Sequence, residues 1–211
     1  MSDLFELKEL SFFYPGQGKL IEDTNLFISA KDSILLMGEN GSGKSTLLKL
    51  ITGLLKPTHG KVLFHGKPLA QATAQTFSSL VFLLQNAHEN LFGLSPRHDL
   101  RIWHIAHPER ITDKALKQIV SQYRDKWDQP YTELSDGEIR ALLMSVLPFM
   151  MDKFWILDEP FDAMDSRRKC ELIELMKQKG RGMLVVSHSA ADFGSLFDRA
   201  LHLENGLLRE H

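Results

Sequence analysis

A glycine-rich segment at residues 38–46 lies between a short apolar run and a run with helical periodicity. The preceding residues 34–37 are typical of a strand buried on both faces. The following residues 46–51 predict a helix that ends at Gly53. Glycines let backbone N–H groups turn toward an anion without Cβ clashes, and the helix directs its positive end at the same place. This order of strand, loop and helix predicts that the segment holds the phosphates of a nucleotide.

Two side chains of this loop supply further groups for phosphate and metal. Lys44 adds a point charge for the β- and γ-phosphates, and the Ser45 hydroxyl can ligate Mg²⁺. The alternative is a glycine-rich turn without a ligand, which the flanking strand and helix disfavour. The predicted nucleotide-binding positions are Gly38, Glu39, Asn40, Gly41, Ser42, Gly43, Lys44, Ser45 and Thr46.

Composition limits the classes of partner. The chain has 211 residues and a formal net charge of −2, with no long Lys/Arg run, so no nucleic-acid partner is expected. No apolar stretch is long enough to cross a bilayer, and the first six residues lack a signal-peptide pattern. The single cysteine, Cys170, excludes an internal disulfide, fits a reducing cytoplasm and is predicted to be buried in a helix.

The remaining pattern predicts an α/β fold with a mostly parallel sheet and a helical insertion. Residues 3–37 indicate short strands with turns, which gives the fold an antiparallel start. Residues 86–151 contain no convincing strand, so we expect a core of residues 1–85 and 152–211 around a helical part. Further strands are predicted at 61–64, 79–84, 154–157 and 182–186, and a hairpin with an Asn-Gly turn at 200–208.

Four helices are predicted beyond the loop. Ser95 and Pro96 form a typical helix start, and Ser135 can cap a helix that runs to Val146. Another helix covers residues 167–177. Thr112 can cap a helix whose apolar face is formed by Ala115, Leu116, Ile119, Val120 and Tyr123.

Polar side chains follow three of the predicted strands. Ligands of open parallel sheets bind beyond the carboxyl ends of the strands, so we expect these side chains near the loop. Asp158 is placed to hold Mg²⁺ through water, and Glu159 to orient or deprotonate an attacking water. Two solvated acids at a strand end are the alternative. His188 can hydrogen-bond a γ-phosphate, and the Gln85 amide can ligate Mg²⁺ or hold a water.

Residues 134–138 have two interpretations, which are compatible. Ser135 and Glu138 have the spacing of a capping box. A helix start with a Ser135 hydroxyl and a Gly137 N–H is also an anion site, which could bind the γ-phosphate held by a second molecule.

Over essentially its whole length, the chain resembles the nucleotide-binding subunits of ATP-binding cassette (ABC) transporters. Residues 38–46 resemble the Walker A motif, residues 134–138 the ABC signature and residues 154–159 the Walker B motif with its catalytic glutamate. Residues 163–165 look like the D-loop. The three remaining matches are Gln85 for the Q-loop, His188 for the switch histidine and Tyr14 for the aromatic residue that stacks on adenine.

The resemblance implies a P-loop NTPase (RecA-like) fold and an ATPase that uses ATP and Mg²⁺. It implies a head-to-tail dimer with a second ABC ATPase subunit, in which each ATP lies between one subunit's phosphate loop and the other's signature. Closure on ATP would drive transmembrane transporter subunits. We then expect the protein at the cytoplasmic face of the membrane, held by these partners. The helical part and the segment after Gln85 would form the docking groove.

Residues 85–93 look like the segment after the Q-loop in ATPases of energy-coupling-factor and cobalt-type importers, which take up vitamins or transition-metal ions. The first hypothesis is therefore an import ATPase of this type. The second is the ATPase of another ABC transporter or exporter. The third is an ABC protein acting on nucleic acid or ribosomes, although no coiled-coil insertion, metal hook or tandem cassette is present in this sequence.

Asp136 departs from the family pattern, since the signature usually carries glycine there. An acid in the first helical turn favours the helix by roughly 0.3–1 kcal/mol, but its charge opposes a nearby γ-phosphate. The hypothesis is that this signature serves a weaker site in a heterodimer. A separate possibility, metal binding by His98, His104 and His107, is disfavoured because no carboxylate or cysteine set accompanies them.

Overall fold

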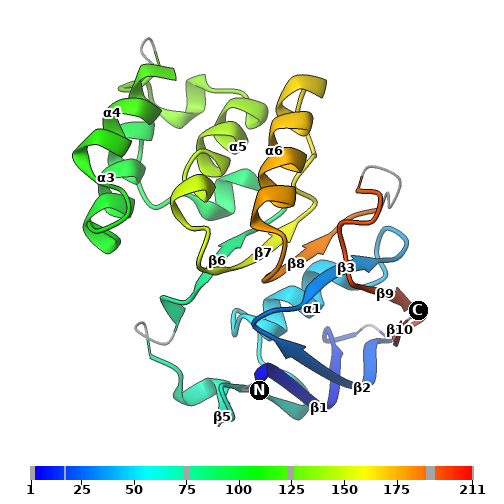
Figure 1. Ribbon diagram of the computed structural model, residues 1–211. Coiled ribbons are helices and arrows are strands. Elements are labelled where there is room, and N and C mark those ends of the chain that lie inside the picture. The colour runs from blue at the N-terminus through cyan, green and yellow to red at the C-terminus, as the bar shows by residue number, and fades with distance from the viewer. Residues whose placement is uncertain (1–2, 17, 74–76, 123–125, 189–192, 211) are drawn as a thin grey trace. The chain divides into compact units, whose positions relative to one another are not determined.

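The computed structural model describes residues 3–16, 18–73, 77–122, 126–188 and 193–210. Their contacts divide the chain into two compact units. The core unit comprises Met1–Phe82, Lys153–Pro160 and Lys179–His211, and the helical unit comprises Leu83–Asp152 and Phe161–Gln178. The elements of both are labelled in Figure 1. The predicted boundaries of the helical part, at residues 86 and 151, stay a prediction.

A six-stranded sheet forms the centre of the fold, in the order β10-β9-β3-β8-β7-β6. Strand β3 pairs in parallel with β8 and β9, and β7 pairs in parallel with β8, which confirms the predicted parallel core. All residues of β7 and β8 are buried, as expected for strands covered on both faces. The strands are β3 (Ser33–Met37), β6 (Leu80–Leu83), β7 (Phe154–Asp158), β8 (Met183–Val186), β9 (Arg199–Glu204) and β10 (Leu207–Glu210).

A second sheet of four strands, in the order β2-β1-β4-β5, is antiparallel in its described pairings. Its strands are β1 (Asp3–Phe13), β2 (Lys19–Ser29), β4 (His59–Phe64) and β5 (Lys67–Pro68). The prediction of short strands here was wrong, because β1 and β2 each run for 11 residues. Shifts in their register accommodate left-handed backbone at Glu9 and Asp23, whose N–H groups are held by Asn25 Oδ1 and Ser11 Oγ.

Helix α1 (Lys44–Ile51) follows β3 and packs in the core unit. Leu47, Leu48 and Leu50 are almost completely buried, together with side chains from both sheets. The helix ends as predicted, with Thr52 at its C-cap and Gly53 in left-handed backbone at φ +78°. The hairpin of β9 and β10 turns through Asn205 and Gly206, both with positive φ, as its Asn-Gly sequence predicts.

The helical unit contains four α-helices within the described residues, α3 (Pro96–Ala106), α4 (Asp113–Gln122), α5 (Asp136–Met144) and most of α6 (Ser166–Lys179). Ser95 precedes α3 with Pro96 in its first turn, and the Thr112 hydroxyl accepts a hydrogen bond from the Ala115 N–H. Of the predicted apolar face of α4, Ala115 and Ile119 are buried, whereas Tyr123 lies outside the described residues. Short 3-10 turns occupy Leu69–Gln71 (η1), Ala87–Asn90 (η2), Tyr131–Glu133 (η3) and Leu147–Phe149 (η4).

The prediction that Cys170 is buried was also wrong. The residue is exposed on α6, not buried. The buried residues of this helix are Leu172 and Met176, which are one turn apart. Cys170 precedes Leu172 by two positions, which turns its side chain about 200° away around the helix.

Candidate functional site

The phosphate loop adopts backbone conformations that require glycine. Gly38, Gly41 and Gly43 have φ values of +151°, +82° and +104°. A Cβ on Gly38 would lie 2.3 Å from the Leu203 carbonyl oxygen, so strand β9 passes directly against the loop. The loop residues 39–42 and the turn of the hairpin also line a cavity of about 280 Å³. These glycine conformations and the cavity beside them are compatible with the predicted binding of phosphates.

The Lys44 side chain is buried inside this loop. Its Nζ donates to the carbonyl oxygens of Gly38 at 2.8 Å and Glu39 at 2.9 Å. These bonds keep the ammonium group at the start of α1, next to the backbone that would surround a phosphate. Tyr14 lies nearby, with its hydroxyl 3.4 Å from Thr46 Oγ1 and its ring edge-on to Phe12. This position is compatible with the predicted stacking of Tyr14 on adenine.

Asp158 ends β7 as a buried carboxylate. Only 1% of its surface is exposed, and neither oxygen has a hydrogen bond of normal geometry to a described residue. Burial raises the pKa of Asp158, while the Ser45 hydroxyl and Lys44 act in the opposite direction. An unpaired buried carboxylate beside a hydroxyl is a set of hard oxygen ligands, so Asp158 and Ser45 fit Mg²⁺.

Replacing Asp158 by asparagine is therefore expected to stabilise the metal-free protein at neutral pH by about 1–2 kcal/mol. Because its folded-state pKa is raised, Asp158 adds stability below its unfolded pKa and loses it as pH rises through the folded pKa. The gain in melting temperature should accordingly shrink in acid, while Mg²⁺-dependent ATP hydrolysis is lost. The exposed Glu204→Gln is the control, and a lower melting temperature for D158N at pH 7 would contradict the assignment.

Glu159 and His188 form a contact within the core unit. Glu159 is only 6% exposed, and its Oε2 lies 3.1 Å from His188 Nδ1. The Glu159 N–H donates to the Val186 carbonyl of β8, and the residue takes a left-handed φ of +44°. Two strand ends thus bring a carboxylate and an imidazole together, an arrangement suited to orienting water and passing a proton.

Gln85 belongs to the helical unit. Its Nε2 donates to Asp162 Oδ2 at 3.1 Å, and the side chain of Arg140 donates to its backbone carbonyl. Sequence reasoning missed both partners, because Arg140 is an arginine in an apolar helix and Asp162 lies outside every motif. Only the position of Asp162, three residues after Glu159, hinted at a role.

The start of α5 is the predicted capping box. The Ser135 hydroxyl accepts from the Glu138 N–H, and Glu138 Oε2 accepts from the Ser135 N–H at 3.0 Å. The pKa of Glu138 is lowered to about 2, mainly by the hydrogen bond from the Lys126 ammonium and further by the hydrogen bonds from Ser135. Gly137 is required by packing, since a Cβ there would lie 2.6 Å from the Ala163 carbonyl oxygen. Residues 163–165 therefore pass directly against the start of α5.

Asp136 has a partner that sequence reasoning did not find. Its Oδ1 lies 3.2 Å from His88 Nε2, in the turn that follows Gln85. The three histidines considered for metal binding each have different surroundings. His104 contacts the Ile111 carbonyl, His107 stacks on Trp103, and His98 is exposed. Among described residues, no cluster of metal-ligating atoms includes any of the three.

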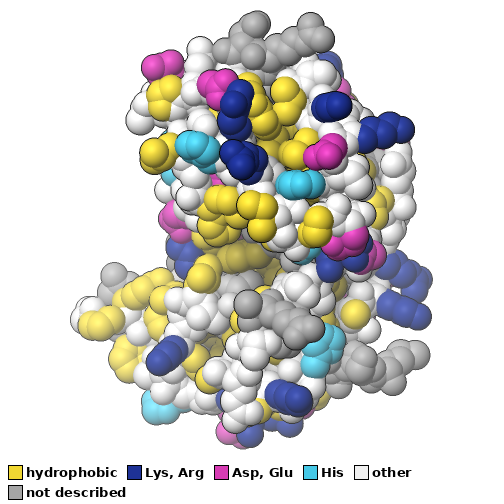
Figure 2. Space-filling model, turned by 90° about the vertical axis from the view of Figure 1, so that its left-hand side faces the viewer, with side chains coloured by type: hydrophobic (Ala, Val, Ile, Leu, Met, Phe, Trp, Pro, Cys, Tyr) yellow, Lys and Arg dark blue, Asp and Glu magenta, His cyan; other side chains and the backbone are white. Residues whose placement is uncertain are grey.

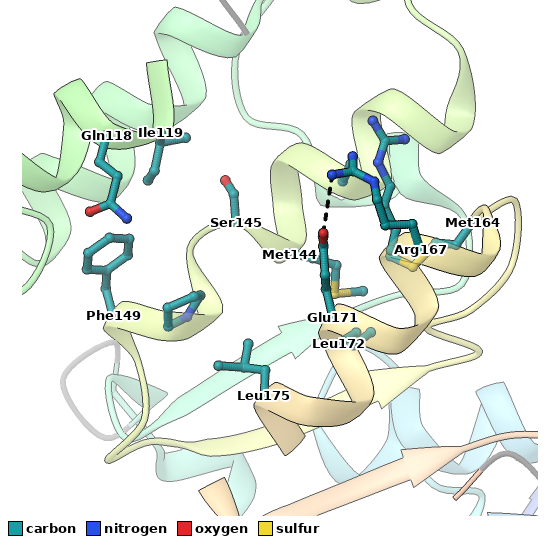
Figure 3. A pocket seen from close by; sticks show the side chains of 13 residues that line it. Gln118, Ile119, Met144, Ser145, Phe149, Met164, Arg167, Glu171, Leu172 and Leu175 are labelled. Atoms are coloured by element: carbon teal, nitrogen blue, oxygen red, sulfur yellow. Dashed lines mark ion pairs between the residues drawn. The ribbon is translucent and has the colours of Figure 1, made fainter. Parts of the chain in front are cut away.

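A cavity of about 580 Å³ opens in the helical unit between α4, α5, η4 and α6 (Figure 3). Ile119, Phe149 and Leu175 point toward it, and Met164 of residues 163–165 reaches its edge. The two arginines that line the cavity form ion pairs. Arg167 pairs with Glu171 of α6, and Arg168 pairs with Asp165, the residue just before this helix. The mainly apolar walls and paired charges do not resemble a phosphate site.

Comparison with known proteins gives consistent matches. The family described as ABC transporter matches residues 21–162. The xylose/arabinose import ATP-binding protein XylG of Sulfolobus acidocaldarius is 27% identical over 228 residues, covering 100% of this chain and 88% of the relative. The cytochrome c biogenesis ATP-binding export protein CcmA of Pseudomonas fluorescens is 34% identical over 170 residues, covering 79% of this chain and 80% of the relative.

Among solved structures, CbiO1 from Clostridium perfringens, described as part of the ABC transporter complex CbiONQ, superposes with a TM-score of 0.74. The match covers 99% of this chain and 88% of that one at 23% identity, so it shows a shared fold. Within the described residues, every helix is too short or too polar to span a lipid bilayer.

Proposed function

The chain belongs to the ABC transporter family of ATP-hydrolysing proteins, and we propose that it powers an importer of the energy-coupling-factor type for a vitamin or a transition-metal ion. One observation carries the hydrolytic part of the proposal. The phosphate loop, the unpaired Asp158 and the Glu159–His188 contact all belong to the core unit. A loop for the phosphates, oxygens for Mg²⁺ and a base for water are the parts that phosphoryl transfer to water needs.

In this proposal, the core unit performs most of the chemistry. Lys44 and the loop N–H groups bind the β- and γ-phosphates, and Tyr14 stacks on adenine. Glu159 orients and deprotonates the attacking water, and His188 holds Glu159 and hydrogen-bonds the γ-phosphate. Ser45 and Asp158 would hold Mg²⁺, which would neutralise charge on the phosphates.

The helical unit supplies the second half of the site to another subunit. Ser135 and Gly137, at the positive end of α5, would bind the γ-phosphate held by the opposite subunit's loop. Two copies, or this chain and a related one, would therefore close around two ATP molecules and reopen after hydrolysis.

A membrane partner is supported by the exposed surface of the helical unit. Phe92, Leu94 and Ile105 are 71%, 78% and 73% exposed, and Ile102 is also exposed. Figure 2 shows apolar side chains interspersed with basic and histidine side chains on this unit. Contiguous exposed apolar patches mark protein interaction sites. We infer that transmembrane subunits dock here and hold the protein at the cytoplasmic face.

The importer type rests on residues 85–93, on the fold shared with CbiO1 and on similarity to an import protein. An exporter ATPase is the second candidate, because an export protein is the more identical of the two relatives described above. The third candidate is an ABC protein that acts on nucleic acid or ribosomes. The net charge of −2 does not favour binding to a polyanion.

Purification of the tagged chain from detergent-solubilised membranes of its own cells tests the proposal. We expect an integral membrane protein and an ABC ATPase partner to copurify. A Phe92→Ser/Leu94→Ser variant should recover at least tenfold less membrane protein yet still bind ATP, because about 1.4 kcal/mol of lost apolar contact corresponds to tenfold. Leu54→Ser, at an exposed leucine of the core unit, is the control.

The identity of the copurified protein separates the candidates. Loss of vitamin or metal uptake when the chain is deleted supports the importer, whereas loss of an exported product supports the exporter. Recovery of ribosomes or nucleic acid without membrane protein would contradict both.

A further inference from the structure

The segment after Gln85 is attached to the signature helix α5 at two points. The buried side chain of Arg140, one turn into α5, donates to the backbone carbonyl of Gln85. Three residues later, His88 Nε2 meets Asp136 Oδ1 at 3.2 Å in the first turn of the same helix. The two contacts lie one turn apart on α5, so the segment is held to this helix at two levels.

The turn that carries His88 is itself fixed by hydrogen bonds. Asn86 Oδ1 accepts from the His88 N–H at 3.0 Å, which caps η2. Asn90, only 9% exposed, closes the turn by accepting from the Leu84 N–H at 2.7 Å and donating to the Leu84 carbonyl at 3.1 Å. The turn that carries His88 is therefore held in place by side-chain hydrogen bonds on both sides of it.

The Asp136 contact depends on the departure from the family pattern, because the glycine usual at this position of the signature has no side chain to reach His88. It is also unnecessary for packing. The side chains of His88 and Asp136 are 51% and 72% exposed, and exposed pairs of this kind add little to stability. The start of the helix is already stabilised by the capping box of Ser135 and Glu138.

We propose that His88 and Asp136 are positioning residues that couple the Gln85 segment to the signature helix. The inference rests on the proposed function, in which the start of α5 binds the γ-phosphate held by the opposite subunit. Misplacement of a positioning group by about 1 Å can cost a large factor in rate, so the second attachment point affects turnover more than stability.

A double-mutant cycle tests the coupling in the whole protein. The variants are His88→Ala, Asp136→Gly, both together, and the conservative His88→Gln and Asp136→Asn, which keep a donor and an acceptor. Glu133→Gln, an exposed acid just before α5, controls for loss of negative charge. Each is assayed for kcat and KM of ATP hydrolysis, for binding of a fluorescent ATP analogue and for melting temperature.

We expect His88→Ala and Asp136→Gly each to lower kcat by about fivefold to tenfold, and the double variant to be no slower than either. Analogue binding and melting temperature should stay near wild type, and the two conservative variants and Glu133→Gln should keep most of the rate. A melting temperature that falls in step with kcat would instead indicate a structural role and overturn the proposal.

Two other results would also overturn it. A faster Asp136→Gly variant would show that the Asp136 charge repels phosphate, as the weaker-site hypothesis states. Equal factors that multiply in the double variant would show independent effects. Failure of the importer proposal is a separate result, because it appears as the absence of a copurified membrane protein, or as the loss of an exported product when the chain is deleted, while these rates remain measurable.

Discussion

Replacement of Glu159 by glutamine is expected to lower the rate of ATP hydrolysis by roughly 10²- to 10⁴-fold, the usual contribution of a general base. The amide keeps the size of the side chain and can still contact His188, but it cannot accept a proton from water. ATP binding should persist, because the phosphate loop and Lys44 are unchanged. A closed dimer bound to ATP should therefore accumulate.

Phosphate release measures the rate, and size-exclusion chromatography with ATP and Mg²⁺ measures the dimer. Glu174→Gln, an exposed position on α6, is the matched control and should behave as wild type. Turnover of Glu159→Gln within a few-fold of wild type would remove Glu159 from the role of base.

Replacement of Lys44 by alanine is expected to weaken ATP binding by about 10- to 150-fold, since a hydrogen bond to a charged group contributes about 1.5–3 kcal/mol. The variant also loses the two bonds to the carbonyls of Gly38 and Glu39. The loop is then less well ordered before ATP arrives, which adds to the loss.

Calorimetric titration with ATP measures this affinity, and Lys56→Ala, an exposed lysine after α1, is the control for the lost charge. Lys44→Arg refines the result, because the larger guanidinium group keeps the charge but does not fit the same buried position. An affinity of Lys44→Ala equal to wild type would show that the phosphates bind elsewhere.

Features encoded by neighbouring residues could be predicted from the sequence. Strand β3, the glycines of the loop and α1 follow one another within twenty residues, and the capping box of α5 spans four. Each depends on interactions between residues close in the chain, which periodicity and capping rules describe well. The strand-end position of Asp158 and Glu159 followed from the apolar run before them.

Features that depend on distant pairing could not be predicted. The Asp99 carboxylate accepts from Phe92 N–H and Tyr131 O–H, and burial together with this bond raises the pKa of Tyr131. Nothing in the local pattern around Asp99 shows this. Cys170 was placed on the wrong face, because the apolar residues of α6 allow more than one choice of buried stripe. The His88–Asp136 contact joins residues 48 positions apart.

The place of β3 in its sheet has a consequence for how the protein is made. Both neighbours of β3, strands β8 and β9, begin about 150 residues later in the chain. At about 5–20 residues per second, a ribosome needs roughly 8–30 seconds to add them. Until then the phosphate loop lacks the Leu203 carbonyl that lies against Gly38, so the nascent chain cannot complete its nucleotide pocket. A chain released before β9 is made would therefore lack the strand that lies against its phosphate loop.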